Sequence, residues 1–229
     1  MRKISETMAA EKENNIFRNG DALNTVLGGI YLKLVPSHTV NRTNFLRKDF
    51  GDISLIYCTT ILNGKDDILT KYTPEILGLD ASEFMQKAEA AAEKNHPATI
   101  TPITDILGLP EQNGMQIYVL ETKGSQYGAA AAAYTTAMSS MVHNFGSGVY
   151  VIPSSIFECL VIPDDTLQKT KELDRMIRAV NANNVDILDQ LSNHVYHYDA
   201  QYGLELGSAY EQRRNEELGY DPGNIYRGF

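Results

Sequence analysis

Residues 148–165 read GVYVIPSSIFECLVIPDD and contain two apolar runs separated by Ser154-Ser155. Apolar runs rich in Val and Ile on either side of a short polar turn are typical of a β-hairpin. The stretch just upstream, residues 116–134 (QIYVLETKGSQYGAAAAAY), repeats the order of apolar run, Gly-bearing polar turn and apolar run. The two stretches therefore predict two successive hairpins, with strands over 117–121, 127–134, 149–153 and 157–162.

A helix is predicted after each hairpin, over 135–145 and from Asp165 onward, so the order of elements is ββαββα. The second helix is predicted to end at 181–184, because Asn tolerates the left-handed backbone found at helix ends. The alanines at 129–133 leave an alternative open. Alanine favours helices over strands, so a helix that continues to Phe145 competes with the second strand of the first hairpin.

The first half of the chain is predicted to begin with an amphipathic helix over 21–34, with Asp21 as its N-cap. Gly28 and Gly29 lie inside this predicted helix at a cost of about 1 kcal/mol each relative to Ala. Residues 53–62 (ISLIYCTTIL) predict a strand. The Asn63-Gly64 dipeptide that follows is a strong hairpin signal, so the chain is expected to return in a second strand over 67–70.

Two further helices are predicted in this half, a short one that begins at Thr73 and ends at Gly78, and one over 82–95 with its cap at Asp80. Residues 100–109 are ambiguous. Near the C-terminus, 195–198 and 204–206 predict a small hairpin, and 208–218 predict a last helix.

These elements predict an α+β fold in which an antiparallel sheet, built mainly from residues 116–163, has helices packed on one face. The predicted organisation is a flexible N-terminal segment over 1–20, one α+β domain over 21–207, and a C-terminal helix and tail over 208–229. Within the domain, 21–112 is the helix-rich half and 113–207 the sheet half.

Composition narrows the classes of function. The net charge of −9 argues against sequence-independent binding of nucleic acid, which needs clustered Lys and Arg. An acidic chain suits a protein partner better, including a partner that itself binds nucleic acid. The N-terminus has no signal-peptide pattern and no apolar run is long enough to span a bilayer, so we expect a cytoplasmic protein with no membrane contact.

The chain has two cysteines, Cys58 and Cys159, each inside an apolar run. They are predicted to be buried thiols in a reducing compartment, although a disulfide between them stays open. No Cys/His cluster has the spacing of a zinc site, and Gly124, Gly128 and Gly146 match no phosphate-binding loop. We therefore predict no cofactor.

The chain resembles the bacterial domain-of-unknown-function family numbered 5688, on the segments YVIPSSIFECLVIPDD and LSNHVYHYDAQYGLEL. The resemblance covers roughly 21–206, and typical members carry a longer N-terminal portion. Many relatives are expected to have histidine where this chain has Phe157. The resemblance favours a strand at 129–133. It implies no established activity, and it implies relatives in gut anaerobes and their mobile elements.

Three patterns in the sequence are candidates for catalytic or metal sites. His194, His197 and Asp199 form H-x-x-H-x-D, but on a strand His197 and Asp199 share one face and His194 lies on the other, so the three would not converge on a metal. Ser154 and Ser155, with His143 nearby in sequence, lack any nucleophile motif and fit an ordinary turn.

Asp164 and Asp165 are the third pattern. They are explained as caps of the following helix rather than as paired carboxylates or cation ligands. We therefore predict no catalytic and no metal-binding residue.

Arg213, Arg214, Tyr220, Tyr226 and Phe229 are predicted to contact a partner, because Arg and Tyr are favoured at interaction hot spots. A disordered tail is the alternative. The functional prediction is a non-enzymatic protein-interaction module. Its most specific form, which rests on the resemblance, is an acidic inhibitor of a host defence nuclease carried by a phage or mobile element. The alternatives are a hydrolase of unknown substrate and a structural homo-oligomer.

Overall fold

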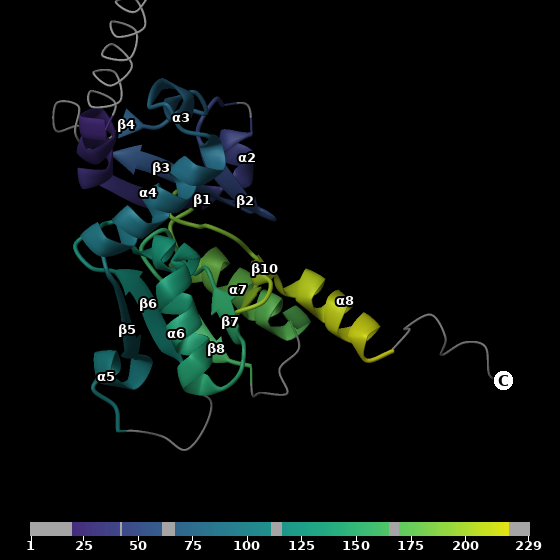
Figure 1. The fold of residues 1–229 in the computed structure, drawn as a ribbon. Helices are drawn as coiled ribbons and strands as arrows, with labels where there is room; N and C mark the ends of the chain where they lie inside the picture. Colours follow the sequence, from purple (N-terminus) through teal and green to yellow (C-terminus); the bar gives the residue numbers. More distant parts are fainter. Residues whose placement is uncertain (1–19, 42, 61–66, 111–115, 165–169, 220–229) are drawn as a thin grey trace, which may run out of the picture.

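Two antiparallel β-sheets organise the protein in a computed structural model, which describes residues 20–41, 43–60, 67–110, 116–164 and 170–219 (Figure 1). The first sheet is built from the N-terminal part of the chain and the second from residues 98–206. The α+β class predicted from the sequence is confirmed.

The first sheet has β3 (Ile53–Thr59) at its centre, and all seven residues of this strand are buried. β1 (Ile30–Pro36) pairs with one side of β3, and β2 (Arg47–Phe50) and β4 (Asp67–Ile68) also pair with it, all antiparallel. β2 was not predicted. The return strand after β3 is confirmed by β4, whereas the predicted turn at Asn63-Gly64 lies outside the described residues.

The second sheet contains six strands in the order β10 (Gly203–Leu206), β9 (Tyr196–Asp199), β7 (Val149–Ile152), β8 (Cys159–Pro163), β6 (Tyr118–Thr122) and β5 (Ala98–Pro102). β7 and β8 form the hairpin predicted from residues 148–163, and β9 and β10 form the predicted C-terminal hairpin. The ambiguous residues 100–109 contain the end of β5 and the short helix α5 (Ile103–Leu107).

Helices cover both faces of the second sheet, so the prediction of helices on one face is wrong (Figure 1). Val149 and Val151 of β7 share the main core with Met138 and Met141 of α6 (Thr135–Phe145). The intervening Tyr150 packs in a second core with side chains of α7 (Thr170–Asn184), which are Leu173 and Ile177. β7 is apolar on both faces, and a strand of that kind is buried on both sides.

The alanine run forms a 3₁₀-helix, η1 (Gly128–Ala133), and not the predicted strand. β6 already pairs with β5 on one side and with β8 on the other, so it has no free edge for a further strand. The helical preference of alanine therefore decides the local structure. The order over this region is β6, η1, α6, β7, β8 and α7 instead of ββαββα.

The first helix ends earlier than predicted, because residues 20–28 are helical and β1 begins at Ile30. Ile30 and Leu34 fit the helical spacing that continues from Leu23, but Ile30, Leu32 and Leu34 also alternate, and in β1 they face the main core. The strand is favoured because β3 supplies hydrogen-bond partners along its whole length. Asn95 completes the helix end, since its side-chain amide donates to the carbonyl of Leu27 at 3.0 Å.

Three further helices agree closely with the predictions from the sequence, namely α3 (Thr73–Ile76), α4 (Ala81–Asn95) and α8 (Gly207–Glu217). The short helix α2 (Ser37–Val40) was not predicted. Asp80 caps α4 as predicted, and its carboxylate accepts from the backbone N–H of Glu83 at 2.8 Å. Within the described residues, none of the helices is long and apolar enough to cross a bilayer.

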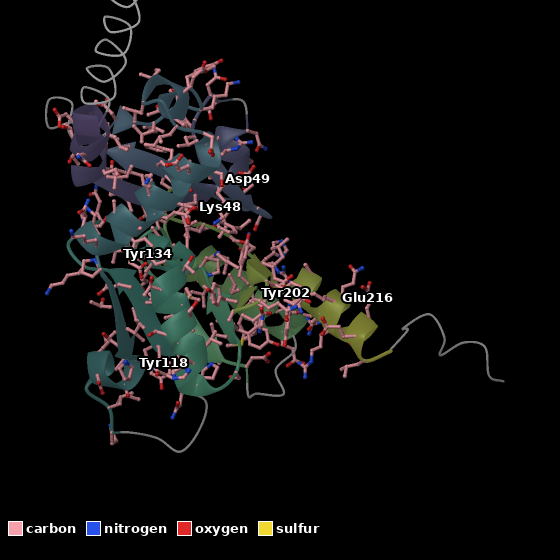
Figure 2. The ribbon with its side chains drawn as sticks, viewed as in Figure 1. Lys48, Asp49, Tyr118, Tyr134, Tyr202 and Glu216 are labelled. Atoms are coloured by element: carbon pink, nitrogen blue, oxygen red, sulfur yellow. The ribbon has the colours of Figure 1, made fainter. Side chains whose placement is uncertain are left out.

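One hydrophobic core joins the two sheets. It contains Leu32 and Leu55 from the first sheet and Leu120 and Val151 from the second. Tyr134, labelled in Figure 2, is buried in this core, and its hydroxyl donates to the carbonyl of Ala92 on α4 at 3.4 Å. The two sheets therefore stabilise each other through shared apolar contacts.

Gly128 lies where the backbone is closely packed against neighbouring residues. A Cβ at Gly128 would lie 2.0 Å from the carbonyl oxygen of Phe157, whereas a Cβ at Gly28 would meet nothing within 4 Å. Gly128→Ala should therefore destabilise the protein by about 1–3 kcal/mol, in the range of overpacked cores. Gly28→Ala should not destabilise it, because this glycine lies in a helix with open space around it. Denaturant unfolding of both variants tests this, and equal stabilities would contradict the packing described.

Candidate functional site

A cleft of about 730 Å³ opens between the first sheet and the segment that follows α7. One wall is formed by 36–41, which includes α2, the floor by Gly51 and Asp52 between β2 and β3, and the other wall by 187–193. The lining side chains are mostly hydroxyls, amides and aliphatic groups. They belong to Pro36, Ser37, His38, Thr39, Asn41, Asp52, Ile187, Leu188, Gln190, Leu191, Ser192 and Asn193.

Asp52 at the floor joins the two sheets. Its carboxylate accepts a hydrogen bond from Ser192 Oγ at 2.8 Å and another from the hydroxyl of Tyr196 on β9. Burial first, and the hydrogen bond to Asp52 next, raise the pKa of Tyr196 far above its ordinary value, so the phenol stays protonated and donates. The carboxylate of Asp52 at the floor of the cleft therefore has hydrogen-bond donors within the protein.

The rim of the cleft carries the two most exposed large apolar side chains of the described residues. Ile187 is 81% exposed and its neighbour Leu188 is 85% exposed. Among the described residues that line the cleft, Asp52 carries a carboxylate and none is Lys or Arg. Asp186 and Asp189 flank the exposed pair in the sequence. The cleft thus presents an apolar pair in acidic surroundings.

Apart from the cleft, a second cluster of polar side chains surrounds His197, a buried residue of β9. Its Nε2 lies 3.2 Å from Asp164 Oδ2, and the hydroxyl of Tyr210 on α8 donates to the same oxygen. The rings of His197 and Tyr210 are stacked, with centroids 3.5 Å apart. Gly148 allows this packing, because a Cβ there would lie 2.6 Å from the imidazole ring.

The titrating groups of this cluster are shifted by their neighbours. Burial by itself would raise the pKa of the Asp164 carboxyl, but hydrogen bonds from His197 and Tyr210 hold that pKa below its ordinary value. Burial, and next the bond to Asp164, raise the pKa of Tyr210 to about 12. At neutral pH Asp164 is therefore an ionised acceptor and Tyr210 a donor.

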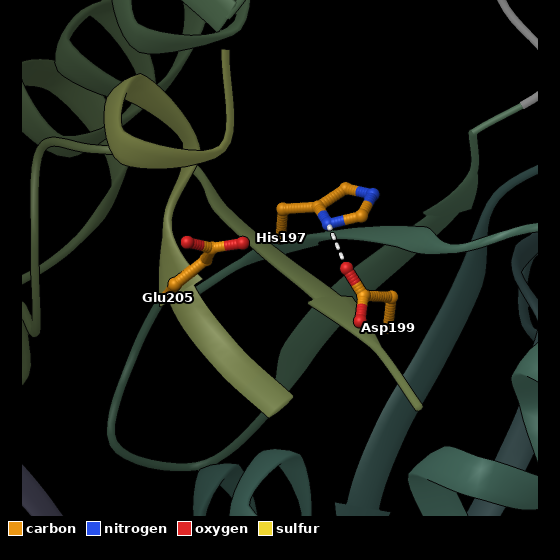
Figure 3. Close-up of side chains that lie close together, drawn as sticks. All are labelled: His197, Asp199 and Glu205. Atoms are coloured by element: carbon orange, nitrogen blue, oxygen red, sulfur yellow. Dashed lines mark ion pairs between the residues drawn. The ribbon is translucent and has the colours of Figure 1, made fainter. Parts of the chain in front are cut away.

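On the other side of the imidazole, His197 Nδ1 faces two acids, Asp199 and Glu205 (Figure 3). Nδ1 lies 4.0 Å from Asp199 Oδ2. A guanidinium nitrogen of Arg213, on α8, donates to Asp199 at 3.0 Å and also pairs with Glu205. The same guanidinium lies 3.5 Å above the ring of Tyr202. A cationic group therefore sits between the two carboxylates.

The histidine pattern of the sequence is separated in the structure. His197 and Asp199 share one face of β9, as predicted, while Tyr196 and Tyr198 face the main core. His194 precedes the strand and pairs with Asp174 of α7 at 3.2 Å. The third acid of the cluster is Glu205, which was not among the candidate residues predicted from the sequence.

The serine candidates are engaged in their own turn. Ser154 Oγ donates to the carbonyl of Glu158 at 3.2 Å, and Ser155 Oγ accepts from the N–H of Phe157 at 3.1 Å. His143 is exposed on α6, and no hydrogen bond links it to either serine within the described residues. The arrangement offers no base to activate a serine hydroxyl.

One carboxylate oxygen of Asp164, Oδ2, lies beside His197 and accepts from Tyr210, which the cap interpretation did not predict. Residues 165–169, which include Asp165 and which a cap at Asp164 would involve, lie outside the described residues. Cys58 and Cys159 are buried, as predicted, and no disulfide joins them. Burial raises the pKa of the Cys159 thiol.

Of the predicted partner-binding residues, Arg213 and Arg214 lie on α8, and Tyr220, Tyr226 and Phe229 lie outside the described residues. Arg213 is held by Asp199, Glu205 and Glu217 of its own chain. Contact with a partner stays a prediction for all five.

The floor of the cleft could not be found from the sequence, because Asp52 and Tyr196 are 144 positions apart. A signal for Glu205 did exist. The predicted C-terminal hairpin pairs Glu205 with His197, so the register of that hairpin indicates their proximity.

The hydroxyl of Tyr196 is predicted to contribute measurably to stability. Tyr196→Phe removes a buried donor to a carboxylate and should lower the free energy of unfolding by about 1.5–3 kcal/mol. Tyr198→Phe is the matched control, because the hydroxyl of Tyr198 pairs with the neutral Ser139 at 3.1 Å and its loss should cost about 1 kcal/mol. Denaturant unfolding measures both. A larger loss for Tyr198→Phe would show that Asp52 does not depend on Tyr196.

Comparison with known proteins supports one assignment. Residues 1–200 match a family described as a family of unknown function, DUF5688. No curated protein and no solved structure matches the chain. Because the match covers most of the chain and includes β9 with His197 and Asp199, the protein belongs to the DUF5688 family.

Proposed function

We propose that the protein is a non-enzymatic protein-interaction module and that the cleft beside Ile187 and Leu188 is its contact surface. Ile187 and Leu188 are 81% and 85% exposed, and they lie next to each other at the rim of the cleft. This exposure is the main support for the proposal. Exposed apolar groups with a polar surround favour burial against a partner. Binding is favoured over hydrolysis because Ser154, Ser155 and Asp164 each have a local structural partner.

The chemistry of the cleft favours a partner segment with basic residues next to an apolar side chain. Asp186 and Asp189 flank the exposed pair, and the chain has a net charge of −9. Opposite charge on the partner would raise the association rate and set the orientation, while the apolar contact supplies affinity. A protein that binds nucleic acid has such a basic surface, so this is the class of partner we propose.

The most specific form of the proposal is an acidic inhibitor of a host defence nuclease, carried by a phage or a mobile element. Such a protein would act by covering a basic nucleic-acid channel. Nuclease activity measured with and without the purified protein tests this form, and inhibition should weaken as the salt concentration rises. Inhibition that does not depend on salt would contradict charge mimicry.

Substitution of the rim pair tests the binding surface. Ile187→Asp with Leu188→Asp should abolish capture of a stoichiometric partner from a host lysate, read by mass spectrometry. The chain offers a matched control, because Ile106 and Leu107 on α5 form a second exposed Ile-Leu pair, 55% and 61% exposed. Ile106→Asp with Leu107→Asp adds the same charge and should leave capture unchanged. Equal capture by both double variants would rule out the cleft.

The C-terminal residues are tested in the same assay with a chain that ends at Gly219. This chain keeps α8, whose Tyr210 belongs to the second core, and removes Tyr220, Tyr226 and Phe229. Loss of the partner would assign these residues to the interface, and retention would exclude them. Light scattering of the purified protein separates self-association from binding to another chain.

A further inference from the structure

The second cluster has the donor set of a metal site. His197 Nδ1 and carboxylate oxygens of Asp199 and Glu205 all lie within 4.8 Å of one another. His197 Nε2 lies 3.2 Å from Asp164 Oδ2, so the Asp164 carboxylate occupies one side of the imidazole ring. Nδ1 is on the other side of the ring and faces Asp199 and Glu205.

Although Arg213 pairs with both acids, two buried nitrogen atoms of this cluster lack hydrogen-bond partners among the described residues. The Arg213 guanidinium reaches both carboxylates, but Nδ1 of His197 has no hydrogen-bond partner among the described residues, although the residue is only 1% exposed. The Nε of Arg213 is also buried without a partner in this part of the chain. Buried polar atoms without partners are uncommon in folded proteins, and each is costly.

The surroundings of His197 are those of a metal ligand. Histidines that bind metal ions usually donate their other ring N–H to a carboxylate, which orients the ring and raises its basicity. Asp164 has this position here, at 3.2 Å from Nε2. Asp199 and Glu205 are 22% and 21% exposed as side chains, so an ion can enter from solvent.

We propose that His197, Asp199 and Glu205 bind a divalent transition metal ion, and that the guanidinium of Arg213 takes the place of the ion when no metal is bound. One nitrogen and two carboxylate oxygens suit Zn²⁺, whereas Mg²⁺ and Ca²⁺ prefer oxygen ligands alone. Tetrahedral Zn²⁺ sets neighbouring ligand atoms about 3.5 Å apart, so shifts of roughly 1 Å close the site. The ion satisfies Nδ1 and neutralises both acids, and the guanidinium returns to solvent.

The proposal predicts competition between Arg213 and the metal. The untagged full-length chain, freed of metal with a chelator, is titrated with Zn²⁺ by calorimetry at pH 7. Arg213→Met, which removes the guanidinium and keeps an unbranched stem, should bind one equivalent of Zn²⁺ at least tenfold more tightly than the wild type. Arg178→Met, at an exposed position on α7, should bind as the wild type does.

Loss of the ligands should abolish this gain. In the Arg213→Met chain, His197→Gln or Glu205→Gln should weaken Zn²⁺ binding at least tenfold, and His194→Ala should not change it. Glu205 lies on an edge strand and is partly exposed, so Glu205→Gln decides the question if His197→Gln does not fold. Equal affinity of Arg213→Met and wild type, or unchanged affinity after Glu205→Gln, would overturn the proposal.

Discussion

The close packing of η1 against strands of both sheets holds the fold together. Ala129, Ala130, Ala131 and Ala132 are at most 1% exposed and contribute only methyl groups, so β1, β6 and β8 can approach the same short helix. Larger side chains would separate the sheets, because protein interiors have no spare volume. The core that the two sheets share follows from this approach.

Strand β9 contributes side chains to both the cleft and the second cluster. Tyr196 and Tyr198 face the main core, and the hydroxyl of Tyr196 donates a hydrogen bond to Asp52 at the floor of the cleft. His197 and Asp199 point the other way, into the cluster with Asp164 and Arg213. Because side chains alternate along a strand, one four-residue segment positions both candidate sites on opposite faces of the sheet.

The two sites differ in what remains available for function. Asp52 is fully engaged, so the cleft acts through its shape, its acidic surroundings and the exposed Ile187 and Leu188. The second cluster keeps an unused buried acceptor at His197 Nδ1 beside two acids that share one arginine. The first arrangement suits recognition of a protein surface, and the second suits capture of a cation.

Local sequence patterns suffice to predict the hairpins at β7–β8 and β9–β10, the cap of α4 at Asp80 and the α+β class, because turn residues, caps and alternation act over a few positions. Long-range pairing and packing, in contrast, make 129–133 form η1 and 30–36 form β1. Those outcomes depend on whether a strand edge is free, and no local pattern shows that. The same reason applies to the sites, since the partners of Asp52 and Asp164 are brought together from distant positions by pairing and packing.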